Sequence, residues 1–415
     1  MNSDKKYIDT TWDFRTANVK EYTHCFHNYP AMMIPQIANR LINLYGKKAK
    51  NLFDPYCGTG TSLVEANLNG IEAIGTDLNP MARLIAEAKT NVIELQILDL
   101  YLKEFNDFLL SLNFGIEKYN NIIAPDFKNI DFWFDKKTKE KLSNIKYFIN
   151  KIKDERVKKF FKVAFSETVR ESSLTRNSEF KLYRMSEKQR ERFNPDVFGR
   201  INNKLVRNRI GLKNYIAAKT INTKTNIYDL NSSESIEKID NESIDIVVTS
   251  PPYGDSRTTV AYGQFSRLSN QWLDIENASQ IDNELMGGKA KPVKEIGVKI
   301  IDETINMILL KDEKRAKDVY SFYEDYSKSI ANVSSVIKKK GYACYVVGNR
   351  RVKDTTLPTD EITKCLFQEY GFKHKNTFIR NIPNKRMPSK NSPTNETGKK
   401  ATTMNNEYIV IMQKQ

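Results

Sequence analysis

The chain has 415 residues, a formal net charge of +15 and a pI near 9.3. This length allows two or three domains with sizeable cores. The basic balance favours a polyanionic partner, nucleic acid before membrane, with a solvated lysine-rich surface as the alternative. No apolar run approaches the ~20 residues that span a bilayer, and the first residues lack a signal-peptide core, so we expect a cytoplasmic protein.

The cysteines and histidines do not indicate a metal centre. The four cysteines are scattered without the paired spacing of a metal site, and the chain has only three histidines. We therefore expect reduced thiols and no bound metal.

The first part of the chain predicts one half of a nucleotide-binding α/β unit. Pro30 suits the first turn of a helix that continues to about residue 44. A strand, a turn with Gly58 and Gly60, and another helix follow, and this turn lets the backbone approach a ligand closely. The next strand ends at Asp77, where doubly wound folds place the carboxylate that binds ribose hydroxyls. Neither a dinucleotide fingerprint nor a phosphate loop is present, which favours a nucleoside with a non-phosphate tail.

A helical, basic segment interrupts the α/β pattern from about residue 95 to residue 215. Helices are predicted at 101–114, 136–153 and 156–169. The basic run at 178–213 is interleaved with aromatic residues, which favours a nucleic-acid surface over a plain solvated face. A long basic loop at 384–400 is a second candidate contact. The candidate DNA contacts are Lys181, Arg184, Arg190, Arg192, Arg207, Arg209, Lys385 and Arg386.

The most informative motif is Ser250-Pro251-Pro252-Tyr253, directly after a buried apolar strand at 244–249. The prolines end the strand, so the motif stands at its carboxyl end, where open α/β sheets bind ligands. The Ser250 side chain and the Pro251 carbonyl can accept hydrogen bonds from one flat donor group, and the Tyr253 ring can stack on a planar base. Taken alone, the motif would by default indicate a strand that is simply ended by a Pro-Pro turn.

The remaining elements complete the α/β pattern on both sides of this motif. The sequence predicts a third strand at 226–230 that carries Asp229, a loop at 254–273 able to close over a substrate, a helix at 311–338, a strand at 341–349, a helix at 359–370, and an antiparallel pair at 372–380 and 407–412.

Taken together, the run from Phe53 to Gly60, Asp77 and the Ser-Pro-Pro-Tyr motif resemble the amino-methylating DNA methyltransferases that use S-adenosylmethionine. The serine form resembles the cytosine-N4 branch. The resemblance implies an α/β fold of the class I methyltransferase type, a doubly wound, mostly parallel sheet with a large helical insertion. It divides the chain into a cofactor-binding half at 1–94, a basic insertion for target recognition at 95–215, and a catalytic half with a basic loop at 216–415.

The resemblance also implies roles for individual residues. Asp54, Gly58 and Gly60 would hold the methionine part of the cofactor, Asp77 the ribose and Asp229 the adenine amino group. The target base would be held by Ser250, Pro251, Pro252 and Tyr253. The remaining residues expected to line the cofactor pocket are His27, Tyr29, Pro30, Pro55, Cys57, Thr61 and Leu78.

Several other functions remain open at this level. The motif is followed by Gly254, a form that also occurs in guanine-N2 RNA methyltransferases, but the glycine motif begins at Phe53 and leaves no room for the amino-terminal RNA-binding domain usual there. Adenine-N6 is the nearest alternative within DNA. A nucleic-acid-binding protein with an inactive methyltransferase fold is the non-enzyme alternative. A partner restriction endonuclease acting on the same site is an expected companion.

Overall fold

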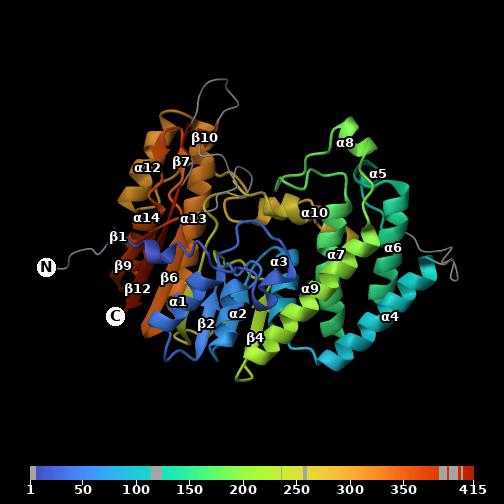
Figure 1. The fold of residues 1–415 in the computed structure, drawn as a ribbon. Helices are drawn as coiled ribbons and strands as arrows, with labels where there is room; N and C mark the ends of the chain where they lie inside the picture. The colour runs from blue at the N-terminus through green and yellow to red at the C-terminus, as the bar shows by residue number, and fades with distance from the viewer. Residues whose placement is uncertain are drawn as a thin grey trace.

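The computed structural model describes residues 6–113, 124–234, 236–255, 259–382, 390–391, 401–402 and 405–415, so Lys385 and Arg386 lie outside the described residues. Its centre is an eight-stranded sheet in the order β1-β9-β12-β6-β5-β2-β3-β4 (Figure 1). The strands are β1 (Lys6–Ile8), β2 (Asn51–Asp54), β3 (Glu72–Thr76), β4 (Thr225–Tyr228), β5 (Ile244–Thr249), β6 (Ile337–Val347), β9 (Phe372–Asn381) and β12 (Asn406–Lys414).

The sheet is doubly wound, as predicted. Strand β2 is parallel to β3 on one side and to β5 on the other, so the strand order reverses direction at β2. Strand β12 runs antiparallel to both of its neighbours, β6 and β9, which confirms the predicted antiparallel pair. Ligands of doubly wound sheets bind at the carboxyl ends of the strands that flank such a reversal.

Helices cover both faces of the sheet, as a parallel sheet requires. Ile246 and Val248 of β5 pack in the core under α1 and α2, whereas Val247 faces the opposite core under α13 and α14. The covering helices are α1 (Pro35–Tyr45), α2 (Thr61–Leu68), α3 (Pro80–Thr90), α13 (Glu313–Val336) and α14 (Thr359–Glu369), and α12 (Lys299–Leu309) packs on α13.

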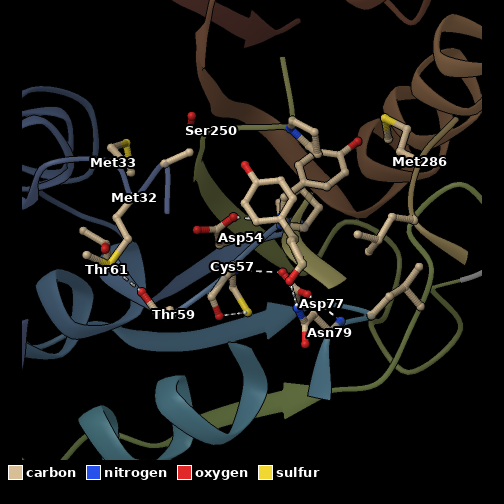
Figure 2. A pocket seen from close by; sticks show the side chains of 18 of the residues that line it. Met32, Met33, Asp54, Cys57, Thr59, Thr61, Asp77, Asn79, Ser250 and Met286 are labelled. Carbon is tan, nitrogen blue, oxygen red and sulfur yellow. Dashed lines mark hydrogen bonds between the residues drawn. The ribbon is translucent and has the colours of Figure 1, made fainter. Parts of the chain in front are cut away.

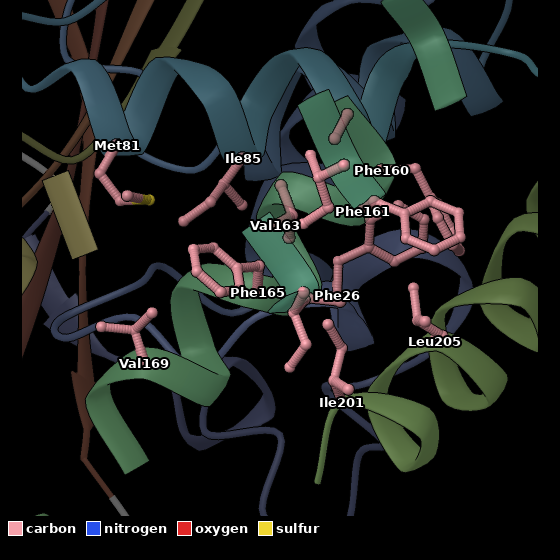
Figure 3. Packing of buried hydrophobic residues seen from close by; sticks show 14 of the residues in the cluster. Phe26, Met81, Ile85, Phe160, Phe161, Val163, Phe165, Val169, Ile201 and Leu205 are labelled. Carbon is pink, nitrogen blue, oxygen red and sulfur yellow. The ribbon is translucent and has the colours of Figure 1, made fainter. Parts of the chain in front are cut away.

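The insertion is helical, as predicted, and it packs on the sheet's own helices. Figure 3 shows Ile85 of α3, Phe161 of α7 and Leu205 of α9 in one apolar cluster. The insertion therefore shares a core with the cofactor-binding half. Its helices are α4 (Leu95–Asn113), α5 (Ile130–Trp133), α6 (Lys136–Lys151), α7 (Glu155–Ser172), α8 (Glu187–Glu191) and α9 (Val197–Ala218).

The prediction of a loop at 254–273 is wrong over the second half of this segment, which forms helix α10 (Tyr262–Trp272). Its small polar residues suggested a loop, but Phe265, Leu268 and Trp272 follow helical spacing and are buried in the insertion's core. Trp272 is fully buried and contacts the ring of Phe134 edge-on. Tertiary packing therefore decides the structure of this segment.

The short elements connect these layers. They are the 3-10 helices η1 (Thr10–Trp12) and η2 (Tyr22–Phe26), the one-turn helix α11 (Ile281–Glu284), and the strands β7 (Arg351–Val352), β8 (Thr355–Thr356), β10 (Lys390–Asn391) and β11 (Ala401–Thr402). Within the described part of the chain, none of the helices has both the length and the apolar character of a membrane span.

Candidate active site

The predicted acidic and serine residues meet at one edge of the sheet. Asp54 ends β2, Asp77 follows β3 and Ser250 follows β5, and these three strands lie side by side. Above them is a cavity with about 940 Å³ of empty space, including its open mouth (Figure 2). The predicted residues that line it are Tyr29, Pro30, Asp54, Pro55, Cys57, Gly58, Thr61, Asp77, Leu78, Ser250 and Pro252.

Asp77 is a half-buried carboxylate with backbone partners. It accepts hydrogen bonds from the N–H groups of Asn79 at 2.7 Å and Gly58 at 3.0 Å. Burial raises the pKa of Asp77. A carboxylate has about four acceptor positions, so Asp77 retains capacity for the two hydroxyls of a ribose.

Asp54 is a second carboxylate at the cavity; it is buried and connects β2 to β5. It accepts hydrogen bonds from the Thr249 hydroxyl at 2.6 Å and from the N–H of Tyr56 at 3.1 Å. Burial raises the pKa of Asp54 to about 6. A cationic group in the cavity would be attracted to this carboxylate and would lower its pKa.

The turn between β2 and α2 requires glycine for a local steric reason. Gly58 and Gly60 have positive φ angles of 49° and 77°. A Cβ on Gly60 would lie 2.9 Å from the Cβ of Ala86, so the turn packs directly on α3. It leads into the first turn of α2 at Thr61, where backbone N–H groups have no partner within the helix.

Three predicted cofactor residues, Gly60, His27 and Asp229, lie outside the cavity lining. The Asp229 carboxylate, whose side chain is 64% exposed, instead receives two hydrogen bonds from Arg83 at 2.7 and 2.8 Å. The structure thus holds the Asp229 carboxylate on Arg83, and its expected contact with the adenine amino group stays a prediction. The next three residues, 230–232, line the cavity in its place. His27 is buried behind the lining, where burial lowers its pKa to about 4.

A second cavity adjoins the first at Ser250. Pro251 and Tyr253 line only this second cavity, whereas Ser250, Met32 and Tyr262 line both. It has about 1170 Å³ of empty space, including its open mouth. The four-residue motif thus stands at the boundary between the two cavities.

A chain of hydrogen bonds starts from Ser250. Its hydroxyl donates to the Tyr253 oxygen at 3.3 Å, and the Tyr253 hydroxyl donates to Glu407 at 3.0 Å. Glu407 also forms an ion pair with Arg380. Sequence analysis missed Glu407 and Arg380 because no motif surrounds them; the insertion of β12 between β6 and β9 brings them to the second cavity.

Gly254 has a structural reason for being glycine. Its φ angle is 152°, and a Cβ there would lie 1.9 Å from the Arg350 guanidinium. Arg350 in turn is paired with the fully buried Asp255 at 3.4 Å. The glycine after the motif is thus required by the packing of Arg350.

The predicted DNA contacts divide into two groups. Arg207 pairs with the buried Glu167 at 2.7 Å, and Arg209 pairs with Asp99 at 2.7 Å. Both arginines therefore join helices of the insertion in this structure, and the DNA contact expected of them stays a prediction. In contrast, Arg190 and Arg192 lie at α8, at the far end of the insertion, and within the described residues no carboxylate forms an ion pair with them.

The surface around α8 also carries aromatic rings. Phe180 and Tyr183 are exposed by 41% and 47%. Arg184 lies over the ring of Phe132 at 3.9 Å from its centre. Lys181 is half-buried in the same segment. Cationic and aromatic groups thus gather here, away from the ion pairs of α9.

The doubly wound sheet with its reversed strand, the glycine turn and the acidic residue after β3 define a class I methyltransferase, an enzyme that uses S-adenosylmethionine. A family model described as DNA methylase, covering N6 and N4 methyltransferases, matches residues 1–88. Type II methyltransferase M.MvaI of Kocuria varians is 42% identical over 443 aligned residues, which cover 99% of this chain and 94% of that protein. The chain therefore belongs to the family of type II DNA methyltransferases of restriction-modification systems.

Two more distant similarities accompany this relationship. The tRNA (guanine(10)-N2)-dimethyltransferase of Methanothermobacter thermautotrophicus is 38% identical over 72 residues, which cover 17% of this chain and 21% of that protein. The solved structure of the rRNA methyltransferase aviRa from Streptomyces viridochromogenes is 10% identical, with a TM-score of 0.32 over 93% of this chain and 88% of that one.

Proposed function

We propose that this enzyme methylates the N4 amino group of cytosine in double-stranded DNA at a specific short site. The observation that carries the proposal is the position of Ser250 between the two cavities, with its hydroxyl donating to Tyr253. A hydroxyl that donates there presents its lone pairs elsewhere, so Ser250 can accept a hydrogen bond from the amino group of a base.

The residues at the first cavity support a placement for each part of S-adenosylmethionine. Asp77 would accept the two ribose hydroxyls, and Asp54 would attract the α-ammonium group. Gly58, Gly60 and the start of α2 would receive the methionine part, with Pro55, Cys57 and Thr61 beside it. The adenine would lie near Leu78 and residues 230–232, with Tyr29 and Pro30 completing the lining.

When bound, the cofactor supplies an electrophilic methyl group. The lone pair of a cytosine amino group is delocalised into the ring, so this nitrogen is a weak nucleophile. Acceptors at the Ser250 hydroxyl and the Pro251 carbonyl would hold both N–H hydrogens and favour a pyramidal nitrogen. The proton becomes acidic once the nitrogen is alkylated, so positioning, which can contribute ~7–11 kcal/mol, would account for most of the rate.

The target base must leave the duplex to reach the second cavity. Extrusion costs a few kcal/mol, which stacking on the Tyr253 ring would partly offset. The basic and aromatic surface around α8 would hold the duplex meanwhile, with Arg184, Arg190 and Arg192 as contacts to phosphates. A restriction endonuclease acting on the same site would be the natural partner.

The decisive experiment identifies the modified nucleoside. The enzyme is incubated with methyl-labelled S-adenosylmethionine and unmethylated bacteriophage DNA, which is then digested to nucleosides and analysed by mass. Label in N4-methylcytosine is expected. Label in N6-methyladenine would reject the assignment of the base and keep the enzyme class. Parallel incubation with transfer RNA tests the guanine-N2 alternative, and label there alone would reject DNA as the substrate.

A further inference from the structure

Lys89 is a buried cation without a carboxylate partner. It lies in the last turn of α3, its side chain has 0% exposure, and its ammonium group donates to the Thr59 hydroxyl at 3.3 Å. Among the described residues, no Asp or Glu forms an ion pair with it. Lysine is almost never fully buried unless it is paired, so an unpaired one needs an explanation.

The groups around Lys89 do not supply the missing charge. His24 and Cys25 of η2, His27 and Lys20 are the titratable neighbours. The nearby carboxylates already have other partners, because Glu65 binds His24 and Glu167 binds Arg207. Burial, with Lys20 adding to it, lowers the pKa of Lys89 to about 7.

Lys89 reaches the cofactor cavity through one hydroxyl group. Thr59 lines the cavity, and its hydroxyl accepts a hydrogen bond from Lys89 and donates one to the Met32 sulfur at 3.1 Å. Figure 2 shows Asp77 and Asn79 on one side of this cavity, and Met32, Thr59 and Thr61 on the other. With the ribose at Asp77, the amino-acid end of the cofactor would lie toward Thr59.

We propose that Lys89 provides the counter-charge for the carboxylate of S-adenosylmethionine, acting through Thr59. This inference rests on the orientation of the cofactor given above. The ammonium group lies behind Thr59, fully buried. From there it would attract an anion bound in the cavity, while remaining out of contact with other anions in the solvent. Because a bound anion favours the charged form of a neighbouring lysine, cofactor binding is expected to take up a proton above pH 7.

Calorimetry with two ligands tests this assignment without DNA. S-adenosylhomocysteine carries the carboxylate, whereas 5′-methylthioadenosine keeps the nucleoside and the sulfur but lacks the amino-acid group. Lys89→Met should weaken the first ligand about tenfold or more and change the second less than twofold. Thr59→Val should also weaken the binding of S-adenosylhomocysteine more than that of 5′-methylthioadenosine, but by a smaller factor than Lys89→Met. Lys48→Met, which removes an exposed lysine, is the matched control and should change neither.

Proton uptake gives an independent readout. Titrations with S-adenosylhomocysteine at pH 8, in two buffers of different ionisation enthalpy, count the protons taken up. The amino group of the ligand contributes equally to wild type and variants, so the difference between wild type and Lys89→Met isolates the lysine. Wild type should take up more protons, by up to about one per site.

The outcomes separate the possible failures. An equal loss of affinity for both ligands would mean that Lys89 supports packing and would overturn the proposal. An unchanged affinity for S-adenosylhomocysteine, or unchanged proton uptake, in Lys89→Met would overturn it as well. If wild type binds neither ligand, the cofactor site itself is misplaced, and both this inference and the proposed function fall.

Discussion

The charged groups at the cofactor cavity and those along helix α9 are held differently. At the cavity, Asp54 and Asp77 are bound by hydroxyl or backbone N–H groups. Along α9, the cations Lys204, Arg207 and Arg209 each pair with a carboxylate. A buried charge without an opposite charge marks a place for a ligand, whereas a paired one holds the fold.

The contrast also divides the basic run of the insertion. Its total charge suggested one DNA-binding surface. The ion pairs show that α9 uses its arginines to join α7, α4 and η2, and the group around α8 is left for a polyanion. The density of basic residues in a segment therefore overestimates the size of its binding surface when the carboxylates that pair with them come from distant parts of the sequence.

The largest effect is expected from Arg207→Ala. This change leaves the Glu167 carboxylate, whose side chain is 4% exposed, with the Asn28 N–H but without its ion-pair partner. Breaking such a pair costs about 3–5 kcal/mol of stability. Chemical denaturation at pH 7 measures the free energy of unfolding. A variant as stable as wild type would mean that Arg207 is free to bind DNA after all.

The same pair has a defined pH dependence. Burial by itself would raise the pKa of Glu167, but the bases His27, Arg207 and Lys204 outweigh it and hold that pKa below its usual value. Stability from a lowered carboxyl pKa is present above the unfolded-state pKa and is lost as the pH falls through the folded-state pKa. The difference between wild type and Arg207→Ala should therefore be largest at neutral pH and should shrink below about pH 4.5.

The next effect is expected at Tyr253, in turnover. Tyr253→Ala removes the ring on which the base would stack, worth ~1–3 kcal/mol, and should slow methyl transfer about tenfold to a hundredfold. Tyr253→Phe keeps the ring but removes the link between Ser250 and Glu407, and should fall between wild type and Tyr253→Ala. Labelled-methyl transfer to bacteriophage DNA measures both, with calorimetry confirming unchanged cofactor affinity. Full activity of Tyr253→Ala would place the substrate elsewhere.

Asp77→Ala tests the ligand role of a charge at the cofactor cavity. A hydrogen bond to a charged group contributes ~1.5–3 kcal/mol, so the affinity for S-adenosylmethionine should fall about tenfold or more. Denaturation of the same variant should show little loss of stability, in contrast to Arg207→Ala. Unchanged affinity would remove Asp77 from the site.

The smallest effect is expected from Arg190→Gln with Arg192→Gln. Each lost phosphate contact should lower the slope of log affinity against log salt by about 0.9 and weaken DNA binding a few-fold. Fluorescence anisotropy with duplex DNA at several salt concentrations measures both quantities. Cofactor affinity and stability should not change. If the salt slope stays the same, the surface around α8 is only solvated.

The sequence predicted the parts of the candidate site that are built from short runs of consecutive residues. The turn at Gly58 and Gly60, the acid at Asp77 and the motif at Ser250 each end a strand, and parallel strands bring such ends together. Glu407 and Lys89 could not be found this way. Glu407 reaches Tyr253 across 154 residues of sequence, and Lys89 resembles any polar residue near a helix end. Helix α10 was missed because its many polar residues obscure an apolar face, which packs on α7 of the insertion and on α3.

The order in which the sheet is completed follows from the position of β12. This strand is made after every other described strand of the sheet, yet it lies between β6 and β9. Until it emerges from the ribosome, those two strands expose open edges that invite pairing with other chains. Glu407 arrives on the same strand. Closing the sheet and completing the target cavity thus both depend on this one strand.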